Sequence, residues 1–395
     1  MSLPPIPDID PPARILMGPG PSNVPARVYR ALMMPTVGHM DPTYFKVMDE
    51  VQVLLRETFA ASNPLTLAIS GTGMAGMETA IANLLEPGDD LIVCNGGIFA
   101  GRMPEIARRY GANVREIKTP WGRPTPPAEI AKALKEKPAK MVAVVHGETS
   151  TGVLQTAIPE IARLCHDAGA ILLVDTVASL AGCEFLTEQW GVDVVYAGSQ
   201  KCLGVPPGLA PITLNKRAEE ILAKRKTKVT SWYLDLTLLR DYWNEKRVYH
   251  HTGPINMTYA LHAGLKLIRE EGLYARLERH ARMAKALYAG LEAMGLKLFV
   301  ENPAERCATV TTVRIPDGAD DVATRKRLLE QHNIEIGGGL GELKGKAWRV
   351  GLMGEGARPN PVLLLLSALG PILKKQGCKV SPGAGVEAAG DLLQN

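Results

Sequence analysis

The chain has 395 residues, of which 46% are hydrophobic and 22% charged, and its 45 basic and 41 acidic residues leave a formal net charge of +4. This is the composition of a folded globular protein, and such a balance of charge argues against a nucleic-acid partner. No apolar run reaches the roughly 20 residues of a membrane helix, and the N-terminus MSLPPIPDIDPP lacks a signal pattern, so we expect a cytoplasmic protein with no membrane segment.

Short apolar runs alternate with helical segments from residue 65 onward. The expected strands are LTLAIS (65–70), LIVCNG (91–96), MVAVVHG (141–147), ILLVDT (171–176), DVVYAGS (193–199) and PITLN (211–215), with helices expected at 73–85, 99–110 and 159–167. This alternation predicts a mostly parallel sheet covered by helices. Ligands of such sheets bind beyond the carboxyl ends of the strands. The residues that close the runs are Ser70, Asn95, His146, Asp175 and, just beyond its strand, Lys201.

A second, smaller αβ region is expected after a helical stretch at 257–290. It contains VTTVRIP (310–316), a helix at 320–332, the glycine-rich IEIGGGLGELKG (334–345), AWRVGLMG (347–354) and a helix ending near residue 375. We therefore expect an N-terminal arm (1–20), a large domain (21–270), a small C-terminal domain (271–376) and a tail (377–395) that frays.

The stretch ISGTGMAGMETA satisfies the pattern GxGxxG, with its glycines at Gly71, Gly73 and Gly76. On this match alone the chain could be an NAD-dependent dehydrogenase. That fingerprint also needs an acid closing the next strand, about 20 residues on, and here that strand ends in Asn95. The general interpretation is a phosphate bound at a helix N-terminus, with hydroxyl groups from Ser70 and Thr72 beside it.

Asp175 and Lys201 close two consecutive strands and should project into the same crevice. A buried carboxylate at 175 either caps the following turn or faces a cation of the ligand, such as a protonated pyridine nitrogen. A lysine in apolar surroundings loses part of its proton affinity and becomes a nucleophile. A phosphate cradle, a carboxylate for a pyridinium nitrogen and an amine for an aldehyde match the three groups by which proteins bind pyridoxal phosphate. A phosphate-binding module without catalysis remains an alternative, and Cys202 is a weaker candidate nucleophile.

Eight segments resemble those of the class V pyridoxal phosphate aminotransferases, in particular the alanine-glyoxylate and serine-pyruvate (serine-glyoxylate) aminotransferases. They are GPGPSNVP, TVGHMDP, NPLTLAISGTGMAGMETA, HGETSTGVLQ, LLVDTVASLAG, GSQKCLGVPPG, KRVYHHTGP and WRVGLMG, spread over residues 15–370. The resemblance implies an α/β protein of fold type I with a large, mostly parallel seven-stranded sheet. It also implies a homodimer with active sites at the subunit interface.

The resemblance assigns a role to each matching residue. Lys201 would form the internal aldimine and move the substrate proton, and Asp175 would pair with the pyridinium nitrogen. Arg349 would bind the substrate carboxylate, since a guanidinium fork suits a planar anion. The remaining cofactor contacts would be Thr72, Gly73, Met74 and Gln200 at the phosphate, Tyr249 and Thr252 reaching the phosphate from the partner subunit, Phe99 stacked on the ring, and Ser150 at its hydroxyl side.

Relatives of the same fold type differ at identifiable positions. Cysteine desulfurases resemble this chain less, because they carry a histidine where it has Gln200. Ureidoglycine-glyoxylate aminotransferases are nearer, but polar amides are expected there in place of His39 and Tyr249. The resemblance therefore favours transfer of an amino group from alanine or serine to glyoxylate, in a small substrate pocket formed with Gly20 and the glycines at 337–339. It assigns no role to His250 or His251.

Overall fold

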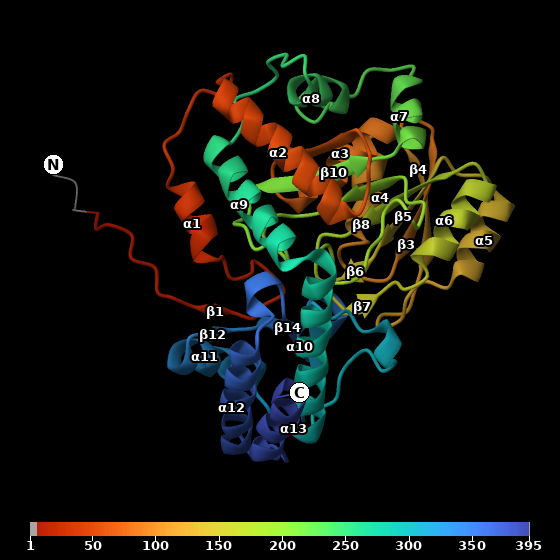
Figure 1. Cartoon of the computed structure of the whole chain (residues 1–395). Coiled ribbons are helices and arrows are strands. Elements are labelled where there is room, and N and C mark those ends of the chain that lie inside the picture. Colours follow the sequence, from red (N-terminus) through yellow and green to blue (C-terminus); the bar gives the residue numbers. More distant parts are fainter. Residues whose placement is uncertain (1–5, 395) are drawn as a thin grey trace, which may run out of the picture.

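Figure 1 shows the computed structural model, which describes residues 6–394, so the first five residues of the predicted arm lie outside the description. The chain forms a large body and, below it in the figure, a smaller one. The hydrophobic core of the large body runs from Val28 to Ile268, and a second core joins Met17 to residues from Met283 to Ala389. The two cores support a domain boundary near residue 270, which remains a prediction.

A seven-stranded mixed sheet forms the centre of the large body. Its order is β2 (Leu65–Ser70), β10 (Leu209–Leu214), β9 (Val194–Tyr196), β8 (Ile171–Asp175), β5 (Met141–Val145), β3 (Asp90–Asn95) and β4 (Asn113–Lys118). Only β10 runs antiparallel to its neighbours. The prediction of a mostly parallel seven-stranded sheet is confirmed. The parallel strands place the ends of β5 and β8 side by side, with Val145 paired to Asp175.

Helices cover this sheet. They are α1 (Ala26–Leu32), α2 (Pro42–Phe59), α3 (Gly73–Leu84), α4 (Arg102–Arg109), α5 (Pro127–Glu136), α6 (Ile158–Asp167), α7 (Lys216–Ala223), α8 (Leu236–Trp243) and α9 (Ile255–Glu271). Helix α3 packs on β9 and β10. A Cβ at Gly76 would lie 3.1 Å from Tyr196 and 3.2 Å from Ala210. The last glycine of GxGxxG therefore lets this helix approach the sheet closely, and a dinucleotide is not needed to explain it.

The small body is built on a three-stranded antiparallel sheet, β11 (Val310–Arg314), β14 (Ala347–Gly351) and β13 (Gly337–Gly338). Its helices are α10 (Leu273–Ala293), α11 (Asp321–His332), α12 (Pro359–Lys375) and α13 (Pro382–Gln394). Short 3-10 turns lie at Pro303–Glu305, Gly341–Leu343 and Gly354–Gly356. Among residues 6–394, no helix is both long and apolar enough to cross a lipid bilayer.

Parts of the predicted arm and tail form regular secondary structure, whereas residues 6–14 of the arm form none. In the arm, β1 (Ile15–Leu16) pairs in parallel with β12 (Ile334–Glu335) of the small body. The frayed tail is wrong for 382–394, because α13 packs against α10 and α12. A Cβ at Gly290 or at Gly385 would lie 2.8 Å from a backbone oxygen of the other helix. This close approach rests on glycines, which hydrophobic periodicity does not register.

Two further differences concern the predicted elements. Helices α1, α2, α5, α7 and α8 were not predicted, and neither was strand β4. Strand β4 reads NVREIK, whose polar residues suit the edge of a sheet rather than its centre. The helical stretch predicted at 257–290 consists of two helices, α9 and α10, divided at Gly272, where φ is +85°. The short hairpin β6 (Gly147–Glu148) and β7 (Val153–Leu154) follows β5 and carries part of the site described next.

Candidate active site

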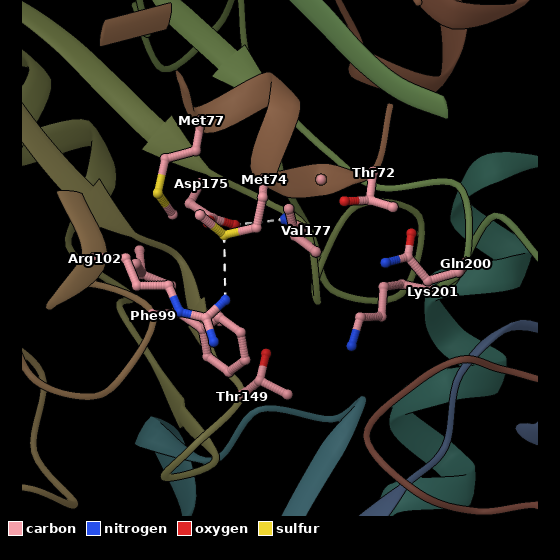
Figure 2. A pocket seen from close by; sticks show the side chains of 13 residues that line it. Thr72, Met74, Met77, Phe99, Arg102, Thr149, Asp175, Val177, Gln200 and Lys201 are labelled. Atoms are coloured by element: carbon pink, nitrogen blue, oxygen red, sulfur yellow. Dashed lines mark hydrogen bonds between the residues drawn. The ribbon is translucent and has the colours of Figure 1, made fainter. Parts of the chain in front are cut away.

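A cavity of about 140 Å³ opens at the carboxyl ends of β5 and β8 and at the start of α3. Figure 2 shows Lys201 and Gln200 entering it from one side, and Phe99 and Arg102 from the other. The lining residues are Thr72, Gly73, Met74, Met77, Phe99, Arg102, Val145, Gly147, Thr149, Asp175, Val177, Gln200 and Lys201. The cavity therefore lies beyond the strand ends, where the sequence predicts that a ligand binds.

Lys201 lies in the turn between β9 and β10 and is only 8% exposed. Its Nζ donates a hydrogen bond to the carbonyl oxygen of Pro19. Burial lowers the pKa of Lys201 to about 8, and nearby Arg349 lowers it as well, whereas the charge of Asp175 opposes the change. About a tenth of the amine is therefore uncharged at pH 7, far more than for an ordinary lysine, and the uncharged amine is the form that can attack a carbonyl carbon.

Gly20 lies directly against this lysine. A Cβ at position 20 would overlap the Lys201 side chain, lying 2.6 Å from Cδ, and the φ of +111° also disfavours any other residue. Two residues further on, Ser22 donates from Oγ to the Lys201 carbonyl (2.6 Å) and from its backbone N to the Gln200 carbonyl (2.9 Å). The predicted site residue Gly20 thus makes room for the amine.

Asp175 ends β8 and is 4% exposed. One carboxylate oxygen accepts a hydrogen bond from the backbone N of Val177 (2.7 Å), and the other accepts one from the hydroxyl of Tyr196 (2.6 Å). Burial raises the pKa of Asp175 to about 6, although these two hydrogen bonds act in the opposite direction. The capping interpretation is therefore confirmed, and the carboxylate also lines the cavity, whereas its pairing with a ligand cation stays a prediction.

The N-terminus of α3 faces the cavity next to Gln200. Thr72 occupies the N-cap position without a side-chain hydrogen bond, and the N–H of Ala75 donates to the Thr72 carbonyl (2.7 Å), which leaves the N–H groups of Gly73 and Met74 for an anion. A Cβ at Gly73 would lie 3.0 Å from Val177, which explains the glycine there. The buried Oε1 of Gln200 has no hydrogen-bond partner among the described residues. That oxygen can only accept, so the donors available to a phosphate here are the NH₂ group of Gln200 and the backbone N–H groups at the helix N-terminus.

Phe99 and Arg102 line the cavity opposite Lys201. The guanidinium of Arg102 lies 4.8 Å from the centroid of the Phe99 ring and donates to the sulfur of Met74 (3.2 Å). Phe99 precedes α4, which begins at Arg102, and therefore lies in a loop rather than in the predicted helix at 99–110. Its ring is placed where it could stack on a planar ligand in the cavity.

Arg349 of β14 lies beside the cavity and is 8% exposed. Its Nε donates to the carbonyl of Gly338 (2.9 Å), and one terminal nitrogen donates to the carbonyl of Thr149 (3.3 Å). Burial lowers the pKa of Arg349, and the charge of Glu148 opposes this change. Within residues 6–394 no carboxylate forms an ion pair with this guanidinium. An incoming carboxylate would supply the missing counter-ion.

Besides Gly20 and Arg349, which lie beside the cavity, several predicted or considered residues do not line it. Ser150 is fully buried behind its wall, and Cys202 is also buried, with the pKa of its thiol raised to about 12 by burial, which argues against a nucleophile. Tyr249 and Thr252 are exposed on the surface of this chain. The cofactor contacts predicted for these last two from a partner subunit, and for Ser150, stay predictions.

The histidines that the sequence left unassigned have structural neighbours. The ring of His250 stacks on Trp232, with centroids 4.3 Å apart. His251 shares a hydrogen bond with the hydroxyl of Ser70 (2.7 Å), and burial lowers its pKa to about 4. Ser70 is therefore engaged by His251 and does not line the cavity, contrary to the hydroxyl predicted there.

Two functional residues were missed by the sequence reasoning. Tyr196 ends β9, the strand beside β8. Its position at the end of the apolar run DVVY could have indicated that it lies near Asp175. Glu148 follows His146 in HGETSTG, and nothing in its spacing indicated burial. Their hydrogen bonds to Asp175 and to the Phe99 loop appear only once the chain is folded.

Residues 20–342 match the family described as Aminotransferase class-V. The chain therefore belongs to the class V aminotransferases, and it is a pyridoxal phosphate-dependent enzyme of fold type I. The dehydrogenase and the non-catalytic phosphate-binding module no longer hold as alternatives.

Known relatives are similar over nearly their whole length. The (S)-ureidoglycine–glyoxylate transaminase of Bacillus subtilis is 40% identical over 97% of this chain and 96% of its own. A solved structure of that enzyme has a TM-score of 0.96, at 41% identity over 98% and 100% of the two chains. The alanine–glyoxylate aminotransferase of Nostoc sp. has a TM-score of 0.91 at 48% identity over 94% and 98%. The Drosophila melanogaster enzyme of that name is 41% identical over 91% and 92%.

The residues of the cavity fit the cofactor. The NH₂ group of Gln200 and the N–H groups at the N-terminus of α3 are donors that suit its phosphate, and the carboxylate of Asp175 suits its ring nitrogen. Lys201 presents an amine to the same cavity, and Phe99 presents a flat apolar face. Bound pyridoxal phosphate supplies an aldehyde and an electron-withdrawing ring, and the chain supplies the groups that hold both.

Proposed function

We propose that the protein transfers the amino group of alanine or serine to glyoxylate, giving glycine and either pyruvate or hydroxypyruvate by a ping-pong mechanism. The observation that carries this proposal is the convergence of Lys201, Asp175 and the N-terminus of α3 on one cavity beside the unpaired Arg349. The relatives named alanine–glyoxylate aminotransferase support the choice of substrates.

Each residue has a defined task in this proposal. Arg349 binds the substrate carboxylate and so turns the amino group toward the cavity. Lys201 removes the proton from the substrate Cα and later returns one, for which a pKa near 8 is suitable. Asp175 keeps the ring nitrogen of the cofactor protonated, and Tyr196 fixes the orientation of that carboxylate.

The assignment of Lys201 is tested by Lys201→Ala, with the exposed Lys228→Ala as a matched control. The purified protein should absorb at roughly 400–430 nm, a band that borohydride abolishes. Lys201→Ala should lose turnover while retaining part of its cofactor affinity, because the phosphate and ring contacts remain. Lys228→Ala should behave like the parent protein. Full turnover in Lys201→Ala would refute the assigned role.

The other candidate is transfer from (S)-ureidoglycine to glyoxylate, favoured by the Bacillus subtilis enzyme of that activity. Against it, His39 and Tyr249 replace the amides expected in that branch, and their rings lie 4.9 Å apart. A kinetic matrix of donors against acceptors separates the two. The highest kcat/KM should be for alanine or serine with glyoxylate, and a higher value for ureidoglycine would reverse the proposal.

We also propose a homodimer in which each subunit contributes Tyr249 and Thr252 to the other site. Support comes from the exposure of both residues and of the neighbouring Trp232, which is 62% exposed. Mixing Lys201→Ala subunits with Thr252→Ala subunits tests the arrangement, because both mutations would fall in one of the two sites of a mixed dimer. Cofactor affinity in the other site should then recover toward the parent value. A strictly monomeric protein would exclude shared sites.

A cytoplasmic location stays a prediction, testable by cell fractionation.

A further inference from the structure

Glu148 is a buried carboxylate that the proposed reaction does not use. It lies in β6, is 5% exposed, and forms no ion pair with a basic side chain in the described part of the chain. Its oxygens instead accept hydrogen bonds from the backbone N (3.0 Å) and Oγ (2.5 Å) of Ser150, and from the backbone N of Ala100 (3.1 Å). A buried charge satisfied in this way demands a fixed arrangement of its donors.

Three successive backbone N–H groups of the Phe99 loop converge on this carboxylate and its neighbour. The N–H of Ile98 donates to the Ser150 hydroxyl (3.0 Å), and those of Phe99 (3.4 Å) and Ala100 donate to Glu148. The loop also lies close to the glutamate, since a Cβ at Gly97 would be 2.5 Å from its Cγ and Cδ. Such a run of N–H groups is an anion-binding nest, here filled by a side chain.

The same segment also contacts Arg349, the residue that we propose binds the substrate carboxylate. Thr149, which follows Glu148, lines the cavity, and its carbonyl accepts the hydrogen bond from Arg349 (3.3 Å). Residues 148–150 therefore contact the stacking loop on one side and the guanidinium on the other. A displacement of Glu148 would move both the ring that faces the cofactor and the group that faces the substrate.

We propose that Glu148 is a positioning residue, which holds Phe99 and Arg349 in one rigid frame and needs both carboxylate oxygens as acceptors to do so. The inference rests on the roles proposed above for Phe99 and Arg349, and it does not depend on which amino donor the enzyme prefers. Glu148 contacts neither reactant, so its effect is transmitted through the loop and the clamp.

Glu148→Gln is the direct test, because the amide keeps the shape but turns an NH₂ group toward at least one N–H donor. Losing a hydrogen bond to a buried charge should raise the dissociation constant for pyridoxal phosphate about 10- to 100-fold. This constant is measured by titrating the full-length, cofactor-stripped protein. Glu86→Gln is the matched control, since Glu86 accepts bonds from two backbone N–H groups and a hydroxyl at 226–227, away from the cavity. It should change the constant less than about twofold.

A double-mutant cycle separates positioning from general destabilisation. In a Phe99→Ala background, Glu148→Gln should raise the cofactor dissociation constant less than about threefold, because the ring that it positions is gone. An equal loss in both backgrounds, or no loss in either, would overturn the proposal. If Glu148→Gln does not fold, Gly97→Ala displaces the same loop from the opposite side and should show the same dependence on Phe99. Because no amino donor is present, the outcome is independent of the proposed substrates.

Discussion

Replacing Asp175 by asparagine should stabilise the cofactor-free protein while weakening cofactor binding. A pKa of about 6, against an ordinary value of 3.8, means that ionising this carboxyl costs about 3 kcal/mol more in the folded protein than in the unfolded chain. Asparagine removes that cost. It can accept only one of the hydrogen bonds from Val177 and Tyr196, which costs about 1 kcal/mol. The expected net gain is about 2 kcal/mol at pH 8.

The pH dependence follows from the sign of the change. The Asp175 carboxyl is less acidic in the folded state than in the unfolded chain. The loss of folding stability caused by ionising it is therefore nearly complete above about pH 6 and falls to about half at pH 5. Urea denaturation of the two stripped proteins should therefore show a gain below about 1 kcal/mol at pH 5. Asp193→Asn is the control, because that buried carboxylate pairs with Arg217 and its loss should destabilise. The reasoning would be refuted if the Asp175→Asn variant were no more stable than the parent protein at pH 8.

Three further outcomes are expected at the same site. Gly20→Ala should force Lys201 away from Pro19 and reduce the borohydride-sensitive absorbance at a fixed cofactor concentration; unchanged absorbance would contradict the contact. Tyr196→Phe should raise the pKa of Asp175, by about 1–2 pH units, and move the acid limb of cofactor affinity to higher pH, so a fixed limb would count against this hydrogen bond. The rate at which stripped protein reacts with the cofactor aldehyde should rise with pH and level off above about 8, as Lys201 loses its proton, and a flat profile from pH 6 to 9 would be inconsistent with that pKa.

The parts of the site that the sequence predicted are those set by strand ends. Continuous apolar runs located β5, β8 and β9, and the parallel arrangement then required Asp175 and Lys201 to face one cavity. The glycines at the start of α3 indicated a phosphate cradle for a similarly local reason, because a helix N-terminus binds anions through its own backbone. The shared cavity and the phosphate cradle can both be inferred from the direction in which a strand or helix runs, without knowledge of contacts between distant segments.

What the sequence could not provide depends on contacts between distant segments. The hydrogen bond from Tyr196 to Asp175 joins neighbouring strands, and the bonds from the Phe99 loop to Glu148 span about 50 residues of chain. The glycine-rich α13 carries its packing in small residues such as Gly385, whose close contact with α10 replaces the usual apolar stripe. Periodicity reports side-chain burial along one element and is silent about such pairings.

The pairing of β1 with β12 has a practical consequence for any shortened form of the enzyme. The segment that carries the family signature, 20–342, stops short of Arg349 and begins after Met17, whose carbonyl accepts a hydrogen bond from Gly351 in β14. A truncated chain cut to those limits would keep the amine and the phosphate cradle. It would lack β14, the central strand that bears the guanidinium, so β11 and β13 would lose their pairing partner, and β12 would lose β1. Affinity tags and deletions therefore belong upstream of Arg14, whose guanidinium already bonds to Asn333.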